Sequence, residues 1–190
     1  RQRQMCIRDR VNIDDHSNDQ NPDPVIIPAP GLSTTNDLRA GATVSGLTGV
    51  VNYTYSLYRI EPVAPFGFDL TVNPRPAGPP AVGGDLKVAG FNLLNFFVTT
   101  INQGDICGPS QDMECRGAYN AFEYSRQLAK TVAALVALDA DVVGLAELEN
   151  HITDDALMTL VNELNAVAGA GTYAGIMTGP LGTDAIKVAI

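Results

Sequence analysis

Two polar residues, Asn92 and Glu147, stand at the ends of segments with the pattern of neighbouring strands. A helical segment separates the two strands, which indicates a parallel pair joined by a crossover. The carboxyl ends of such strands meet at one edge of the sheet, where open α/β folds bind their ligands. Amide and carboxylate oxygens suit a hard divalent cation such as Mg²⁺. The sequence therefore predicts a cation site made by Asn92 and Glu147.

Each of these polar side chains also has an interpretation without a ligand. Asn92 and Asn95 are poor strand formers, and both can simply bond loop backbone. Glu147 and Glu149 fall on the same side of an extended backbone, and Leu148 falls on the other. Two carboxylates that face one way repel each other unless a cation or a donor lies between them. We expect one of the two to be a solvated charge at the rim.

Two cysteines, Cys107 and Cys115, lie in one loop that is rich in residues allowing the chain to turn back. A local disulfide is the favoured interpretation, and it would imply an oxidising compartment. Free thiols and a half-built metal site are the alternatives. The metal alternative is the weaker one, because no nearby histidine or second cysteine pair completes a zinc set.

The segment from Asp85 onward alternates between strand and helix, the pattern of an α/β layer. A polar loop of about 20 residues interrupts it, and loops of that length are usually functional or stapled. Thr153 and Asp154 are candidate caps for the second helix. The expected elements are a strand at 86–93, the loop at 98–118, a helix at 121–138, a strand at 142–145, a helix at 156–168, and strands at 173–177 and 185–190.

The region 11–72 has a different pattern, with short runs of β-branched and aromatic residues separated by glycine-containing turns. These runs predict part of a small barrel or sandwich, and a strand module this short is marginal alone. The segment 73–84 is rich in proline and glycine, and we expect it to be a linker. The strands are expected at 11–13, 42–45, 49–53 and 55–60.

The composition limits the classes of protein that the chain can belong to. At 190 residues with 45% hydrophobic content, it fits one globular domain or two modest ones. No uncharged apolar run reaches the roughly 18 residues that suggest a membrane span. The formal net charge of −9 argues against a broad basic face for nucleic acid. Bound cations weaken that objection, because they can bridge carboxylates to phosphate oxygens.

Both ends of the sequence have unusual features. Residues 1–10 are basic and resemble a translated adapter sequence, so we expect a non-native prefix and leave it out of the fold prediction. At the other end, residues 184–190 are apolar and strand-like, and they stop without a turn or a cap. We therefore expect the chain to be a fragment of a longer protein, with any signal peptide upstream of it.

An ordered series of motifs carries a resemblance to a known family, at residues 86–95, 107–109, 115–118, 139–150 and 182–187. These motifs resemble the extracellular bacterial endonucleases of the ExeM/NucH type. That type belongs to the endonuclease/exonuclease/phosphatase superfamily, which deoxyribonuclease I typifies. The resemblance implies that 85–190 is the first half of a deoxyribonuclease I-like four-layer α/β sandwich. It also implies that 11–72 is a partial OB-like β module.

The resemblance also implies roles for individual residues. Asn92 matches the family's first-motif asparagine near the scissile phosphate, and Glu147 matches its metal-binding glutamate. The cofactor would be Mg²⁺, or another divalent cation such as Mn²⁺ or Ca²⁺. Ala146 stands where the family usually has glutamine, which removes a hydrogen bond behind the metal ligand.

Three further positions match the family without an assigned role: Glu149, Asp184 and Lys187. The family's general base is a late histidine, and neither His16 nor His151 matches it. By itself the chain is therefore expected not to catalyse.

The function that the resemblance implies is hydrolysis of DNA phosphodiester bonds outside the cell, with RNA as the alternative nucleic acid. A second possibility within the superfamily is a phosphatase or a sphingomyelinase. A third, of another class, is a secreted module that binds single-stranded nucleic acid without catalysis. The sequence indicates no protein partner.

Overall fold

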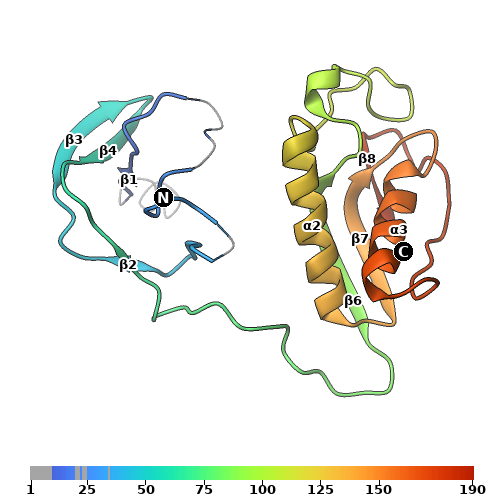
Figure 1. Ribbon diagram of the computed structural model, residues 1–190. Helices are drawn as coiled ribbons and strands as arrows, with labels where there is room; N and C mark the ends of the chain where they lie inside the picture. Colours follow the sequence, from blue (N-terminus) through green and yellow to red (C-terminus); the bar gives the residue numbers. More distant parts are fainter. Residues whose placement is uncertain (1–9, 20–21, 23–24, 34) are drawn as a thin grey trace, which may run out of the picture. The chain divides into compact units, whose positions relative to one another are not determined.

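The computed structural model describes residues 10–19, 22, 25–33 and 35–190, and it has mixed α/β structure (Figure 1). Most of the expected non-native prefix, residues 1–9, lies outside the described residues. The chain divides between Ala77 and Gly78 into two compact units. In the described residues, no helix has both the length and the apolar character needed to cross a membrane.

The C-terminal unit is built on a three-stranded sheet in the order β6-β7-β8. Strands β6 and β7 are parallel, as their separation by a helix predicts, whereas β7 and β8 are antiparallel. The sequential elements of this unit are β6 Val88–Phe96, the short 3-10 helix η1 Ile101–Gln103, α2 Ala121–Leu138, β7 Val142–Glu149, α3 Asp155–Ala168 and β8 Ile186–Ala189.

Local signals explain where the first long helix begins and ends. The Asn120 side chain accepts a hydrogen bond of 3.0 Å from the Glu123 amide, and Glu123 in turn accepts one of 2.8 Å from the Tyr119 amide. These two bonds satisfy amides that the first turn leaves unpaired. After Leu138, Asp139 adopts a left-handed conformation with φ 47° and ends the helix. The observed bounds are those that the sequence predicts.

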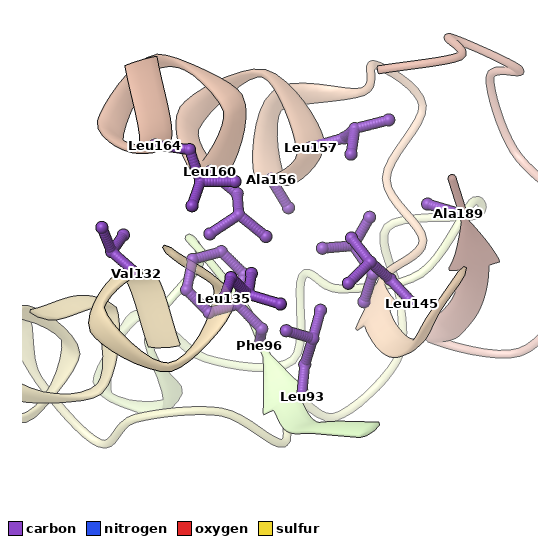
Figure 2. Close-up of a cluster of buried hydrophobic side chains, with 11 residues drawn as sticks. Leu93, Phe96, Val132, Leu135, Leu145, Ala156, Leu157, Leu160, Leu164 and Ala189 are labelled. Carbon is purple, nitrogen blue, oxygen red and sulfur yellow. The ribbon is translucent and has the colours of Figure 1, made fainter. Parts of the chain in front are cut away.

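The hydrophobic core lies between the sheet and the two helices, α2 and α3 (Figure 2). Phe96 and Leu148 from the sheet are fully buried, as is Leu160 from α3. Both helices supply residues to the same cluster, so they cover one face of the sheet. On the opposite face Val88 and Val188 stay 70% and 62% exposed. The described residues of this unit therefore form two layers, and the four-layer sandwich stays a prediction.

The predicted strand at 173–177 is wrong, because these residues form no strand. The side chain of Asn165 bonds both backbone groups of Tyr173, which a sheet ladder would otherwise use: its Oδ1 accepts from the Tyr173 amide at 2.8 Å, and its Nδ2 donates to the Tyr173 carbonyl at 3.0 Å. The other predicted strands form, with β6 and β7 extending further toward their carboxyl ends than expected. Both extensions contain irregular backbone that short strand patterns do not reveal.

The N-terminal unit contains two small sheets among its described residues, in the orders β1-β4-β3 and β2-β5. The β3–β4 hairpin turns at Tyr55 and Ser56, both at positive φ, as two-residue hairpin turns require. Residues 73–84 form neither helix nor strand. The OB-like assignment stays a prediction. The strands are β1 Asn12–Ile13, β2 Thr43–Val44, β3 Gly49–Thr54, β4 Leu57–Pro62 and β5 Phe68–Asp69.

Candidate functional site

The carboxyl ends of β6 and β7 share an unusual backbone. The pairing register between these strands shifts between Asn92 and Phe96. Within this stretch Leu94 and Asn95 have φ of 54° and 57°, and Glu147 on β7 has φ of 61°. Residues other than glycine avoid this region, and holding one there costs about 1–3 kcal/mol. Such strain collects at functional sites, so its position beside Glu147 makes this sheet edge the candidate site.

The carboxylate of Glu147 is held from both sides by the neighbouring strand. Asn92 Nδ2 donates to Glu147 Oε1 at 2.8 Å, and the Asn95 amide donates to Oε2 at 3.2 Å. The structure thus brings Asn92 and Glu147 together. The Asn92 oxygen accepts from the Leu94 amide at 2.7 Å, which fixes the orientation of the side-chain amide. Asn92 therefore orients the carboxylate, and its direct ligation of a metal stays a prediction.

Gln127 on α2 supports this edge and was missed by the sequence analysis. Its Nε2 donates to the carbonyls of Leu94 and Asn95, both at 3.2 Å. Its Oε1 is buried without a hydrogen-bond partner among the described residues. The bonds to two consecutive carbonyls hold the strained backbone in place. No sequence signal identifies Gln127, because a glutamine at the margin of an amphipathic helix is ordinary.

Glu149 is buried, with only 1% of its surface exposed. Its Oε2 accepts from the amides of Val98 at 2.7 Å and Thr99 at 3.2 Å, which fixes the chain leaving β6. Its Oε1 lies 3.6 Å from Cys107 Sγ. That contact is not a hydrogen bond, because a disulfide sulfur carries no proton. Of the two carboxylates, Glu149 is buried and Glu147 is half-buried, so Glu147 is the more solvated one.

The predicted disulfide between Cys107 and Cys115 is present. Both cysteines are buried, and they pack with Phe97 and Ala185 in a second, smaller hydrophobic cluster. Inside the loop, Cys107 and Met113 exchange two backbone hydrogen bonds, of 2.9 and 3.0 Å. The long polar loop is therefore stapled, and it packs beside the buried Glu149.

The remaining family-matched residues, Asp184 and Lys187, do not contact Glu147. Asp184 pairs with Arg116 at 3.1 Å, and both side chains are exposed. Lys187 is buried, and its Nζ bonds Asp154 and the Gly179 carbonyl, the latter at 2.8 Å. These contacts tie the segment before β8 to the rest of the unit. We therefore assign Asp184 and Lys187 to holding that segment.

Asn150, directly after β7, is a second residue that the sequence analysis missed. It is completely buried, and its Nδ2 donates to the carbonyls of Leu181 and Asp184, each at 2.8 Å. Its Oδ1 accepts from the Leu181 amide at 3.0 Å. This side chain satisfies three backbone groups of the loop, so it positions the start of β8.

A comparison with known protein families finds a match in the other unit. Residues 2–69 match a family described as a domain of unknown function, DUF8508. The matched segment includes residues 2–10, which the sequence analysis set aside, and it ends before the Glu147 site. No curated protein and no solved structure matches the chain. The function of the Glu147 site therefore has to be argued from its geometry.

The residues at this edge fit a divalent cation that keeps most of its own water. No group of three or more His, Cys, Asp and Glu residues gathers to hold a metal within the described part of the chain. Mg²⁺ is usually bound by one or two carboxylates, with waters and substrate phosphates completing the shell. The half-buried Glu147 accepts one hydrogen bond at each oxygen, which leaves lone pairs for such an ion. Glu147 is therefore the carboxylate at this edge that would hold such an ion.

Neither histidine is bonded to the candidate site. His151 Nδ1 lies 2.9 Å from Thr153 Oγ1 and its Nε2 lies 3.4 Å from Gln111 Nε2. His16 belongs to the N-terminal unit, where it contacts Glu61 and Pro62. Both histidines thus have local partners.

The Lys187–Asp154 pair makes stability depend on acidity. Burial alone raises the pKa of Asp154, but the hydrogen bonds from Lys187 and the Gly179 amide outweigh it and leave that pKa below its ordinary value of 3.8. A lowered pKa in the folded state stabilises the fold above the unfolded-state value, and the gain is lost as the pH falls through the folded-state value.

We therefore expect the free energy of unfolding of the wild type to fall more steeply than that of Asp154→Asn between about pH 5 and pH 2. Urea unfolding at a series of pH values measures both slopes. Asp155→Asn, at the exposed neighbouring position, should keep the wild-type slope. Identical slopes for the wild type and Asp154→Asn would contradict the assignment.

Proposed function

We propose that the C-terminal unit carries part of a metal-dependent phosphodiesterase site, with Glu147 as the residue that holds the cation and DNA as the substrate. One observation carries the proposal. A glutamate at positive φ is held by Asn92 and Asn95 at the carboxyl-terminal edge of two parallel strands. An exposed glutamate has no need of such support, whereas a metal ligand does, because its oxygens must be oriented.

Each residue at this edge of the sheet would have a separate role in holding the cation. Glu147 would anchor the cation, while Asn92 and the Asn95 amide would keep its carboxylate in one orientation. Gln127 would hold the backbone that supplies the Asn95 amide. A bound divalent cation would supply positive charge next to a phosphoryl oxygen. That charge would also offset the repulsion between the substrate phosphate and a chain with a net charge of −9.

Two further features support a secreted enzyme of the endonuclease/exonuclease/phosphatase type. The sheet face opposite the helices leaves Val88 and Val188 largely exposed, as expected of a face that a second sheet covers in a four-layer sandwich. The buried disulfide fits an oxidising compartment outside the cell.

Magnesium binding tests the role of Glu147 directly. In a Mg²⁺ titration of the full chain followed by NMR, amide shifts around Asn92 and Glu147 should saturate. Glu147→Gln should weaken that binding by about tenfold or more, because an amide cannot replace the charge of the ligand. The matched control, Glu163→Gln on the exposed side of α3, should leave the affinity unchanged. Equal affinities for Glu147→Gln and the wild type would overturn the proposal.

Binding measurements with different substrates then distinguish the nuclease from the alternative functions. Duplex DNA should bind more tightly with Mg²⁺ than without it, and only when Glu147 is intact. Affinity for single-stranded nucleic acid that does not depend on Mg²⁺ would instead favour a non-catalytic binding module. A Mg²⁺-dependent preference for sphingomyelin vesicles or an inositol phosphate over DNA would favour the other superfamily activities. Nicking of plasmid DNA is not expected, because neither histidine is bonded to the site; Glu147-dependent nicking would show that another residue acts as the base.

A further inference from the structure

A polar cleft lies in the N-terminal unit, on the sheet formed by β1, β4 and β3. Its volume is about 470 Å³, within the roughly 300–1,000 Å³ of small-molecule sites. Side chains alternate along a strand, and Asn52 pairs in register with Arg59. One face of the β3–β4 hairpin therefore presents Asn52, Arg59 and Glu61 to the cleft. Tyr53 and Tyr58 pack against each other on the opposite face, with ring centroids 4.8 Å apart.

Arg59 is the central cation of the cleft, and it is incompletely bonded. Its Nη1 pairs with Asp14, and its guanidinium lies 5.3 Å from the centre of the Tyr55 ring. Its Nε is buried and has no hydrogen-bond partner among the described residues. A buried donor without a partner is costly, so Nε marks a position where an acceptor from a ligand or a water would be favourable.

A second group of side chains fixes the other wall of the cleft. Glu61 accepts from Asn52 Nδ2 at 3.1 Å and pairs with His16 Nδ1 at 2.9 Å. His16 Nε2 lies 2.7 Å from the Pro62 carbonyl. These mutual bonds hold the polar groups in place before any ligand arrives. Prior ordering of this kind lowers the entropic cost of binding.

The mixture of charges decides the class of ligand. Phosphate oxygens only accept hydrogen bonds, and they would meet the carboxylates of Asp14 and Glu61. An ammonium group only donates, and it would meet the guanidinium of Arg59. Hydroxyl groups both donate and accept, so a neutral polyhydroxyl compound matches the whole lining.

One aromatic residue adds a preference for shape. Tyr55 stands at the hairpin turn beside the cleft with 79% of its surface exposed, which offers a flat apolar face next to the polar groups. The ring of a pyranose sugar has one flat face of C–H groups and an edge of hydroxyl groups, and it can contact both features at once. We propose that this cleft binds a neutral pyranoside, with its ring on Tyr55 and its hydroxyl groups on Asn52 and Arg59.

This inference is independent of the Glu147 proposal, because every residue of the cleft belongs to the N-terminal unit. It assigns a ligand class to the segment that matches DUF8508, since residues 14–61 lie within residues 2–69. The cleft is open to solvent and makes contact mainly through polar groups. We therefore expect a weak dissociation constant, on the order of 1 mM.

The test uses the full chain and NMR titrations with methyl β-glucoside, methyl β-galactoside and maltose as probes. At least one probe should shift the amides around Asn52, Tyr55 and Arg59 in a saturable way. Tyr55→Ala removes the stacking face at an exposed position and should weaken binding by about tenfold. The matched control is Tyr53→Ala, on the same hairpin but the opposite face, and it should retain the wild-type affinity.

Several outcomes would overturn the inference. These are no saturable shift up to about 50 mM of any probe, or equal losses in Tyr53→Ala and Tyr55→Ala. Parallel titrations use inorganic phosphate, putrescine and an oligothymidylate. If one of these saturates the same amides and the sugars do not, the cleft is a site for an anion, a cation or a single strand. Asn52→Ala provides a second variant, and an unchanged sugar affinity in it would also contradict the proposed contacts.

Discussion

Replacing Lys187 with alanine should lower the free energy of unfolding of the C-terminal unit by about 3–5 kcal/mol. The Lys187 and Asp154 side chains are only 1% and 8% exposed. Without the lysine, the buried Asp154 carboxylate has no positive partner, and the Gly179 carbonyl loses a hydrogen-bond donor. Urea unfolding followed by amide signals of α3 measures the loss.

Lys130→Ala is the matched control, because Lys130 is exposed on α2. It should change stability by no more than about 0.5 kcal/mol. A double variant, Lys187→Met with Asp154→Leu, separates charge from packing. It should recover much of the loss, because apolar replacement of both partners of a buried pair is often tolerated. A loss below about 1 kcal/mol for Lys187→Ala would contradict the buried pair.

Loss of the Cys107–Cys115 disulfide should cost the same unit about 2–3 kcal/mol. The two cysteines are eight positions apart, and closing a loop of that size restricts the unfolded chain by roughly this amount. The staple also packs against Phe97 and lies beside the buried Glu149. Removing the disulfide should therefore also speed hydrogen exchange at the Val98 and Thr99 amides, which donate hydrogen bonds to Glu149.

The variant to use is Cys107→Ala with Cys115→Ala, compared with the parent with and without a phosphine reductant. Both proteins should carry Cys6→Ala, so that no third thiol can exchange. The reductant should destabilise the parent and leave the double variant unchanged. A parent that keeps its stability under reduction would contradict the role of the staple.

Patterns that depend on neighbouring residues allowed the scaffold to be predicted. Apolar periodicity predicts α2, and a helix between two strands predicts the parallel pair that brings Asn92 to Glu147. The details of the site depend instead on contacts between residues far apart in sequence. No local pattern reveals that Gln127 reaches the carbonyls of Leu94 and Asn95.

The failures of prediction have the same physical origin. Tyr173 and its neighbours have the composition of a strand, but the Asn165 side chain takes the backbone bonds of Tyr173 that a ladder would use. No local pattern distinguishes Glu149 from Glu147 as the buried carboxylate. The amides of Val98 and Thr99, just past the end of β6, donate to Glu149 and make its burial tolerable.

The engagement of Tyr173 by Asn165 has a consequence for self-association. Residues 173–177 form no strand beside β8, and the Ile176 amide donates to the carbonyl of Ile190, directly after β8, at 2.9 Å. In the described part of the chain β8 is therefore an edge strand of its sheet. An open edge with the exposed Val188 is a template on which another molecule can add a strand. Because β8 has only four residues, it offers few backbone hydrogen bonds to an added strand. A short edge strand of this kind protects the protein against aggregation.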